Sequence, residues 1–127
     1  MDAIQIRAGY EAMGRGDGSV LAGMLSPDAT WHIPGTSPLA GTHIGCDAIF
    51  EFWKKVAMLA NGGMKLDVID VLANADRAVV FVLGRSKRKG LSLEERGVHV
   101  YRFQNGKVID GRFYYEDQAA YDAFWSA

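Results

Sequence analysis

The sequence changes its hydrophobic period once, and this change limits the folds that the chain can adopt. Up to Ala60 the apolar residues recur at helical spacing, whereas from Met64 onward apolar and polar residues alternate, as in strands that bury one face. Lys89-Gly90 and Asn105-Gly106 lie between alternating segments and are typical of tight hairpin turns. The pattern therefore predicts four long antiparallel strands, near residues 64–73, 77–88, 92–104 and 107–115.

The residues before Met64 predict helices and one short strand. Helical spacing runs over about residues 2–14, over a short segment that ends before Pro27, and from Ile49 to Ala60. Residues 29–33 favour a strand, and the Pro- and Gly-containing residues 34–45 favour a loop, whose length is a mild sign of function. Near the end of the chain, Asp117 is placed to cap a last short helix.

This order of elements, helices first and a strand meander last, indicates an α+β domain with helices on one face of a curved antiparallel or mixed sheet. The chain shows no internal repeat and no linker, so we expect a single domain over residues 1–127. Hydrophobic residues make up 49% and charged residues 23% of the chain, which favours a globular protein over a disordered one.

Charge and cysteine content exclude several classes of partner. The net charge of −1 provides no electrostatic footprint for nucleic acid, and no apolar run approaches the length of a membrane span. Cys46 has no second cysteine to pair with and the N-terminus lacks a secretory signal, so we expect a cytoplasmic protein. We expect no cofactor.

Alternation also assigns each residue of the last two strands to one sheet face. The more aromatic set is expected on the concave, helix-covered face and comprises Gly97, His99, Tyr101, Phe103, Ile109, Gly111, Phe113 and Tyr115. The opposite set is expected outward, in solvent or against another subunit, and comprises Val98, Val100, Arg102, Val108, Asp110, Arg112 and Tyr114. Glycines within strands mark bulges or leave room for a neighbour on the concave face.

Three concave-face residues are candidate catalytic groups, namely His99, Tyr101 and Tyr115. A neutral imidazole on an apolar face can exchange a proton near pH 7 or hydrogen-bond a carbonyl, and phenols can orient a polar ligand group. The alternative for His99 is a core histidine bonded to a neighbouring tyrosine. The alternative for both tyrosines is a position at a solvated rim.

Six further residues are candidate ligand-binding groups: Trp31, Ile33, Phe52, Trp53, Phe113 and His32. Aromatic residues at helical spacing, such as Phe52 and Trp53, are more often core than ligand contacts. His32 has the opposite parity to Trp31 and would face the pocket only if the strand bulges beside Pro34. His43 is expected to be exposed in the loop, and the three histidines lack metal-ligand spacing, so we expect no metal site.

Two long stretches of the chain resemble SnoaL-like domains of the nuclear transport factor 2-like superfamily. They are GRGDGSVLAGMLSPDATWHIPGTSPLAGTHIGCDAIFEFW, at residues 14–53, and VHVYRFQNGKVIDGRFYYEDQAAYDAFW, at residues 98–125. The resemblance implies a cone-shaped domain whose N-terminal helices cover the concave face of a strongly curved sheet over a deep pocket. It also implies a homodimer, which we expect to form through the outer sheet face.

The catalytic sets of that superfamily are not matched by this chain. The aspartate base of steroid delta-isomerases corresponds to Ile33, their oxyanion tyrosine to Gly9 with Tyr10 one residue away, and their second aspartate to His99. The aspartate of the polyketide cyclases corresponds to Phe113, and the Asp-Arg-Asp set of the epoxide hydrolases has no counterpart. The superfold hosts many activities, so the resemblance names no reaction.

Three hypotheses of function follow. The first is a proton-transfer enzyme (isomerase, cyclase or dehydratase type) on a small hydrophobic carbonyl compound, with His99 as acid/base and Tyr101 or Tyr115 as donor. The second is a ligand-binding or sequestering domain without chemistry, which the missing carboxylates at Ile33 and Phe113 favour. The third is a protein-interaction module that uses the open sheet face.

Overall fold

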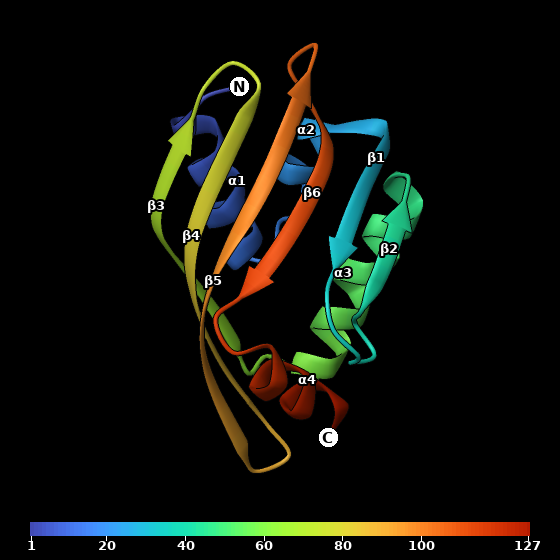
Figure 1. The fold of residues 1–127 in the computed structure, drawn as a ribbon, viewed down its shortest axis with the longest axis vertical. Helices are drawn as coiled ribbons and strands as arrows, with labels where there is room; N and C mark the ends of the chain where they lie inside the picture. The colour runs from blue at the N-terminus through green and yellow to red at the C-terminus, as the bar shows by residue number, and fades with distance from the viewer.

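The computed structural model describes all 127 residues, which form an α+β domain (Figure 1). The four helices are α1 (Ala3–Gly14), α2 (Ser19–Met24), α3 (Cys46–Ala60) and α4 (Gln118–Ser126). The six strands are β1 (Leu25–Ile33), β2 (Gly41–Ile44), β3 (Met64–Ala73), β4 (Arg77–Arg88), β5 (Leu91–Gln104) and β6 (Lys107–Tyr115).

All six strands belong to one sheet, in the order β2-β1-β6-β5-β4-β3. The pairing of β1 with β6 is parallel and every other pairing is antiparallel, so the sheet is mixed. The four predicted long strands are confirmed. Lys89 and Asn105 have positive φ and are each followed by a glycine with positive φ, the conformation that tight hairpin turns require.

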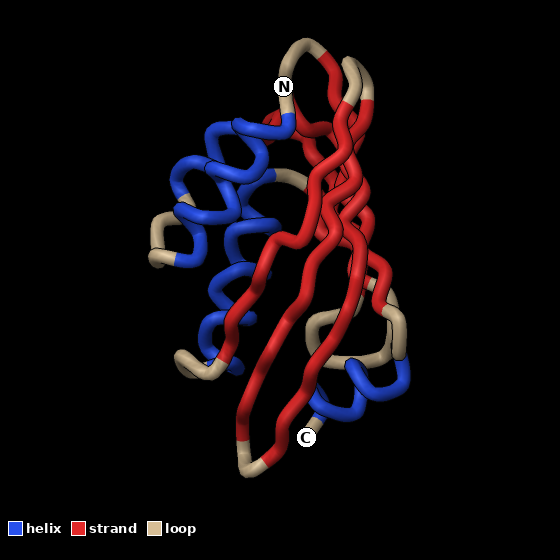
Figure 2. Tube along the Cα trace, turned by 90° about the vertical axis from the view of Figure 1, so that its left-hand side faces the viewer, coloured by secondary structure: helices blue, strands red, loops and turns tan.

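The helices and the sheet form two layers, with α1, α2 and α3 together on one side of the strongly twisted sheet (Figure 2). The short helix α4 closes the end of the molecule beside the β4–β5 hairpin (Figure 1). None of the four helices combines the length and the apolar character needed to cross a bilayer.

The hydrophobic core lies between these layers. Trp31, Ile49, Val80 and Phe113 are each at most 5% exposed, and α4 extends the core with three further buried aromatic residues, Tyr121, Phe124 and Trp125. Burial of each large side chain contributes roughly 1.5–3 kcal/mol, so this interior is the main source of stability.

Side-chain caps stabilise the N-termini of α1 and α4. The Asp2 carboxylate accepts the Gln5 N–H at 2.8 Å while the Gln5 side chain accepts the Asp2 N–H at 2.9 Å, which is a reciprocal capping box. As predicted, Asp117 caps α4 and accepts the Ala120 N–H at 3.0 Å. At the far ends of α3 and α4, the Arg88 guanidinium donates to the carbonyls of Leu59, Phe124 and Ala127.

Two expectations about the first half of the chain are wrong. The second helix does not continue to the residue before Pro27: it ends at Met24, and Leu25 has an extended backbone and opens β1 with its side chain in the core at 7% exposure. The segment 34–45 is not a loop throughout, since Gly41–Ile44 pairs with β1 as the edge strand β2.

A bulge in β6 corrects the expected faces of two residues. Tyr101 pairs with Gly111 and Arg102 with Asp110, but Phe103 pairs with Val108, which leaves Ile109 as the extra residue. A bulge reverses the alternation locally. Val108 therefore faces the core at 5% exposure, although Ile109 was expected there.

Candidate functional site

A hydrogen-bonded network joins α1 to β5 on the inner side of the sheet. The Tyr10 hydroxyl lies 2.6 Å from His99 Nδ1 and also hydrogen-bonds the Tyr101 hydroxyl. His99 is 8% exposed and Tyr101 4% exposed, while the ring of Tyr10 is half-buried. The strand alternation that placed His99 and Tyr101 together on the concave face is therefore supported by their shared partner.

The Tyr10 hydroxyl has one proton, so it donates at most one of these two hydrogen bonds. Where Tyr10 donates to His99 Nδ1, the imidazole proton is on Nε2. Where His99 Nδ1 donates to Tyr10, Nε2 has a free lone pair. His99 Nε2 has no partner in the protein, so it can donate to or accept from a further group.

Burial keeps all three groups of the network uncharged at neutral pH. It lowers the pKa of His99 to about 3, because the imidazolium loses its hydration inside the protein. Burial also raises the pKa of Tyr101, and burial together with the neighbouring Tyr101 raises the pKa of Tyr10. His99 is thus a neutral hydrogen-bonding group and a weak base, in contrast to a histidine that titrates near pH 7.

Aromatic rings surround the network. The ring of Trp31 lies 5.3 Å from that of Tyr101 and 4.9 Å from that of Phe113, and the His99 ring lies 4.5 Å from Phe113. Gly111 leaves the room that Trp31 occupies, because a Cβ there would lie 2.8 Å from Trp31 Cε3. Of the two explanations for a glycine within this strand, the structure thus supports room for a neighbour.

A small apolar cavity borders the network. Its volume is about 10 Å³, and all ten lining residues are hydrophobic, including Tyr10, Trp31 and Tyr101. Such a volume holds about one water molecule. Met24 and Leu21 of α2 form part of the opposite wall. The deep pocket that the resemblance implies is therefore not formed beside the network in this structure.

The other predicted site residues on the inner face do not belong to the hydrogen-bonded network. Ile33, Phe52 and Phe113 are buried in the core, and half-buried Trp53 makes an edge contact with Trp31 at 6.1 Å. Tyr115 stacks on Tyr121 of α4, with ring centroids 3.9 Å apart. Tyr115 is therefore not a direct member of the network, although burial raises its pKa.

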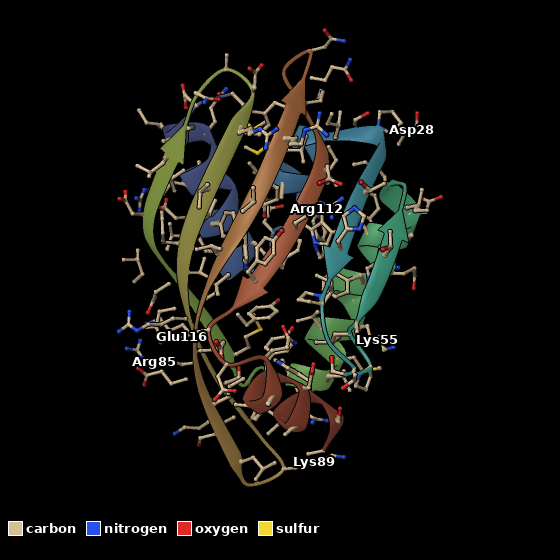
Figure 3. All side chains as sticks on the ribbon, in the orientation of Figure 1. Asp28, Lys55, Arg85, Lys89, Arg112 and Glu116 are labelled. Atoms are coloured by element: carbon tan, nitrogen blue, oxygen red, sulfur yellow. The ribbon has the colours of Figure 1, made fainter.

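His32 lies on the outer face of the sheet, in a separate polar cluster. Its Nε2 is 2.8 Å from Asp110 Oδ1 and its Nδ1 is 3.1 Å from Thr42 Oγ1. Thr30 donates to the same carboxylate at 2.6 Å, and Arg112, which projects from β6 on the side away from α1 (Figure 3), donates at 3.1 Å. The cluster ties β1, β2 and β6 together and is not part of the interior site.

These hydrogen bonds decide the charge of Asp110. Burial alone would raise the pKa of this carboxyl group, but the hydrogen bonds from Thr30, His32 and Arg112 outweigh burial and lower the pKa. Asp110 is therefore ionised at neutral pH, and its side chain is only 13% exposed.

Three residues near the site were missed or misplaced by sequence reasoning. Tyr10 was not among the candidate site residues, although the comparison with the steroid delta-isomerases places it one residue from the position of their oxyanion tyrosine. Glu95 is 7% exposed and accepts the Asp117 N–H at 3.2 Å, and burial raises its pKa. Strand alternation places Glu95 on the same face as His99, and this pattern could have identified it as a buried residue. His43 is half-buried instead of exposed, because it lies opposite Trp31 in the β1–β2 pair.

Comparison with known proteins identifies relatives over almost the whole chain. The family model described as "SnoaL-like domain" matches residues 6–111. An uncharacterized protein of Mycobacterium tuberculosis, Rv0034, is 31% identical over 122 residues, which cover 95% of this chain and 93% of that protein.

Solved structures agree with this match. Bal32a, from a soil-derived mobile gene cassette, has 35% identity and a TM-score of 0.89 over 95% of this chain and 93% of its own. An NTF2-like protein of unknown function from Burkholderia pseudomallei has 28% identity and a TM-score of 0.83 over 97% and 95%. TerC, co-crystallized with polyporic acid, has 26% identity and a TM-score of 0.82 over 97% and 96%. The protein therefore belongs to the SnoaL-like domain family of the nuclear transport factor 2-like superfamily.

Proposed function

We propose that this domain binds a small, mostly apolar molecule through a carbonyl or enol oxygen and polarises that oxygen by hydrogen bonding, while water admitted by the open site accepts or returns the proton next to it. The reaction would be of the isomerase, cyclase or dehydratase type. The observation that carries the proposal is the buried Tyr10–His99–Tyr101 network beside a wholly apolar cavity.

The chemistry follows from the neutrality of the network. Uncharged donors held in a dry site stabilise negative charge that develops on a ligand oxygen, and they need little reorganisation to do so. His99 contributes as a hydrogen-bond partner and not as a general base, because its pKa is lowered to about 3. Ile33 and Phe113 are buried apolar residues, so this end of the site polarises the ligand without a carboxylate. A domain that binds without chemistry would share the network and release its ligand unaltered.

Ligand binding requires the site to open. Small-molecule pockets usually measure roughly 300–1,000 Å³, far more than the cavity of about 10 Å³. Part of its wall is α2, a six-residue helix with no buried residue. A ligand that binds the open state would shift the population toward it.

A pair of Tyr→Phe variants tests the proposal. TerC is similar over nearly its full length and was crystallized with polyporic acid, so polyporic acid is the first probe, and quenching of Trp31 and Trp53 fluorescence is the readout. Tyr10→Phe removes the hydroxyl shared by His99 and Tyr101 and should raise the Kd about five- to tenfold, the value of a hydrogen bond of roughly 1 kcal/mol. The control is Tyr114→Phe, on a side chain that is 51% exposed. Equal Kd values for the two variants would refute the proposal, and product analysis separates turnover from binding alone.

We also propose that two copies of the chain pair through the outer sheet face. No helix covers the middle of this face, and Leu72, Phe81 and Tyr114 are 57%, 37% and 51% exposed. Sedimentation equilibrium should give the mass of a dimer for the wild type and the mass of a monomer for Tyr114→Glu. A wild-type protein that already has the mass of a monomer would exclude the pairing. We also propose a cytoplasmic location, because Cys46 has no disulfide partner within the chain.

A further inference from the structure

One side of the small cavity beside the Tyr10 network is formed by α2. Leu21 and Met24 of this helix line the cavity together with Tyr10 and Tyr101. Both side chains are only half-buried, and α2 contains no buried residue. The layer between the cavity and solvent is therefore thin at α2, in contrast to the sheet side, where Trp31 lines the cavity and is 4% exposed.

A glycine of α1 provides the room for these two side chains. At Gly9 an added Cβ would lie 2.7 Å from Leu21 Cδ2 and 3.4 Å from Met24 Cε. A larger residue at position 9 would therefore take space that the two side chains now fill. Gly9 directly precedes Tyr10, so Leu21 and Met24 lie beside the turn of α1 that carries the central hydroxyl of the network.

Few interactions hold α2 in place. The helix packs on α1, and one side-chain hydrogen bond joins it to the sheet, from Lys107 Nζ of β6 to the Gly23 carbonyl at 2.5 Å. Lys107 is exposed, so water can replace this bond at small net cost. The turn that leads into α2 is open at Gly16, where φ is +84° and an added Cβ would contact nothing within 4 Å. Segments with few buried contacts open most easily, so α2 is the part of the cavity wall that is easiest to move.

We infer that the space filled by Leu21 and Met24 is the apolar subsite of the ligand, and that α2 moves outward to vacate it. The inference rests on the proposed function and adds the shape of the ligand. The ligand has an apolar ring about as large as these two side chains together, next to the oxygen that meets the Tyr10 network. The bound ring packs against Trp31 and replaces the apolar contacts of Leu21 and Met24, so the network stays covered by apolar surface.

Toluene and phenol, each a single ring, test the subsite by NMR titration. The indole signal of Trp31 reports on the cavity, and that of Trp125, which does not line the cavity, is the internal control. Leu21→Ala should lower the Kd of both compounds about tenfold relative to the wild type, because apolar sites enlarged by truncating a leucine bind small aromatic molecules. The matched control is Val20→Ala, a truncation on the same helix at a side chain that is 38% exposed and does not line the cavity.

Hydrogen exchange of the wild-type protein tests the movement of α2 without any variant or ligand. The Ala22 and Leu25 amides donate to the carbonyls of Gly18 and Ala22. These amides should exchange at least about 100-fold faster than the amide of Val80, a fully buried residue in the middle of the sheet, if α2 opens locally. Protection equal to that of Val80 would overturn the inference.

The titrations have two further outcomes that would overturn the inference. One is a Kd for toluene in Leu21→Ala that is no lower than in Val20→Ala. The other is failure of both Leu21→Ala and Met24→Ala to fold, since side chains that the fold cannot lose cannot yield to a ligand. If Leu21→Ala alone fails to fold, Met24→Ala takes its place and should show the same gain.

A double variant separates this inference from the proposed function. In Leu21→Ala, the added change Tyr10→Phe should raise the Kd of phenol about five- to tenfold, the value of a hydrogen bond, and should leave the Kd of toluene unchanged. Equal effects on phenol and toluene would count against the proposed role of the network, whereas the gain in toluene binding would still support the apolar subsite.

Discussion

Gly111→Ala provides a direct test of how the interior is packed. The added Cβ would lie 2.8 Å and 2.9 Å from two ring atoms of Trp31 and 3.2 Å from Tyr101 Cε1. Trp31 is 4% exposed and packs against Tyr101 and Phe113. The rings therefore have little space to move, and the new methyl group must displace at least one of them.

Two opposing effects set the size of the change. Overpacking of a filled core costs about 1–3 kcal/mol. Replacing glycine by alanine reduces the entropy of the unfolded chain and returns about 0.4–1 kcal/mol. The difference between the two ranges is a net loss in the free energy of unfolding of about 0–2.6 kcal/mol, and a second Gly→Ala variant without overpacking isolates the overpacking cost.

Urea unfolding followed by tryptophan fluorescence measures this loss. Gly84→Ala is the matched control, because Gly84 also lies within a long strand but its added Cβ would meet Leu66 Cδ1 at an ordinary 3.7 Å. Gly84→Ala should leave stability unchanged or slightly higher. Equal stability of Gly111→Ala and Gly84→Ala would show that Trp31 is not packed tightly against Gly111 of β6.

Three further predictions concern charge and capping. His99 has a lowered folded pKa of about 3, so below about pH 6.5 the unfolded chain binds a proton that the native chain does not. Stability should therefore fall as the pH is lowered from 6.5 to 3, and His99→Phe should flatten this slope in urea titrations. A slope as steep in His99→Phe as in the wild type would contradict the burial of a neutral His99. Asp110 has a lowered folded pKa, so its contribution to stability is present above its unfolded pKa and is lost as the pH falls through the folded pKa. Asp110→Asn should therefore lower the free energy of unfolding by about 1–3 kcal/mol at pH 7 and by far less at pH 2. An equal loss at both pH values would argue against an ionised Asp110. Asp2→Ala removes the α1 capping box and should lower the free energy of unfolding by about 0.5–2 kcal/mol. Thermal unfolding measures this loss, with Asp76→Ala as the control variant. Indistinguishable melting temperatures of the two variants would show that the cap does not stabilise α1.

Local patterns were sufficient to predict most of the architecture. The four long strands followed from alternation together with Lys89-Gly90 and Asn105-Gly106, because side-chain parity and turn conformation are properties of neighbouring residues. The same parity placed His99 and Tyr101 on the concave face, where both meet Tyr10.

The missed features depend on pairings between distant segments. The bulge at Ile109 is a slip of register against β5, and alternation within β6 alone contains no sign of it. The strand β2 forms because its residues find β1, and this pairing turns His43 toward the inner face. The small size of the cavity results from how rings from four elements fill one space, which no single segment reveals.

The Tyr10 network closes a long loop in the chain, because Tyr10 and His99 are 89 residues apart in sequence. Contacts of such separation form slowly, since the entropy of closing the loop is lost before the contact is gained. The site is thus complete only when the first helix and the penultimate strand have docked, so partly folded chains should not bind. A ligand held there stabilises the native state as a whole, and a shift of the melting temperature with ligand concentration reports on binding.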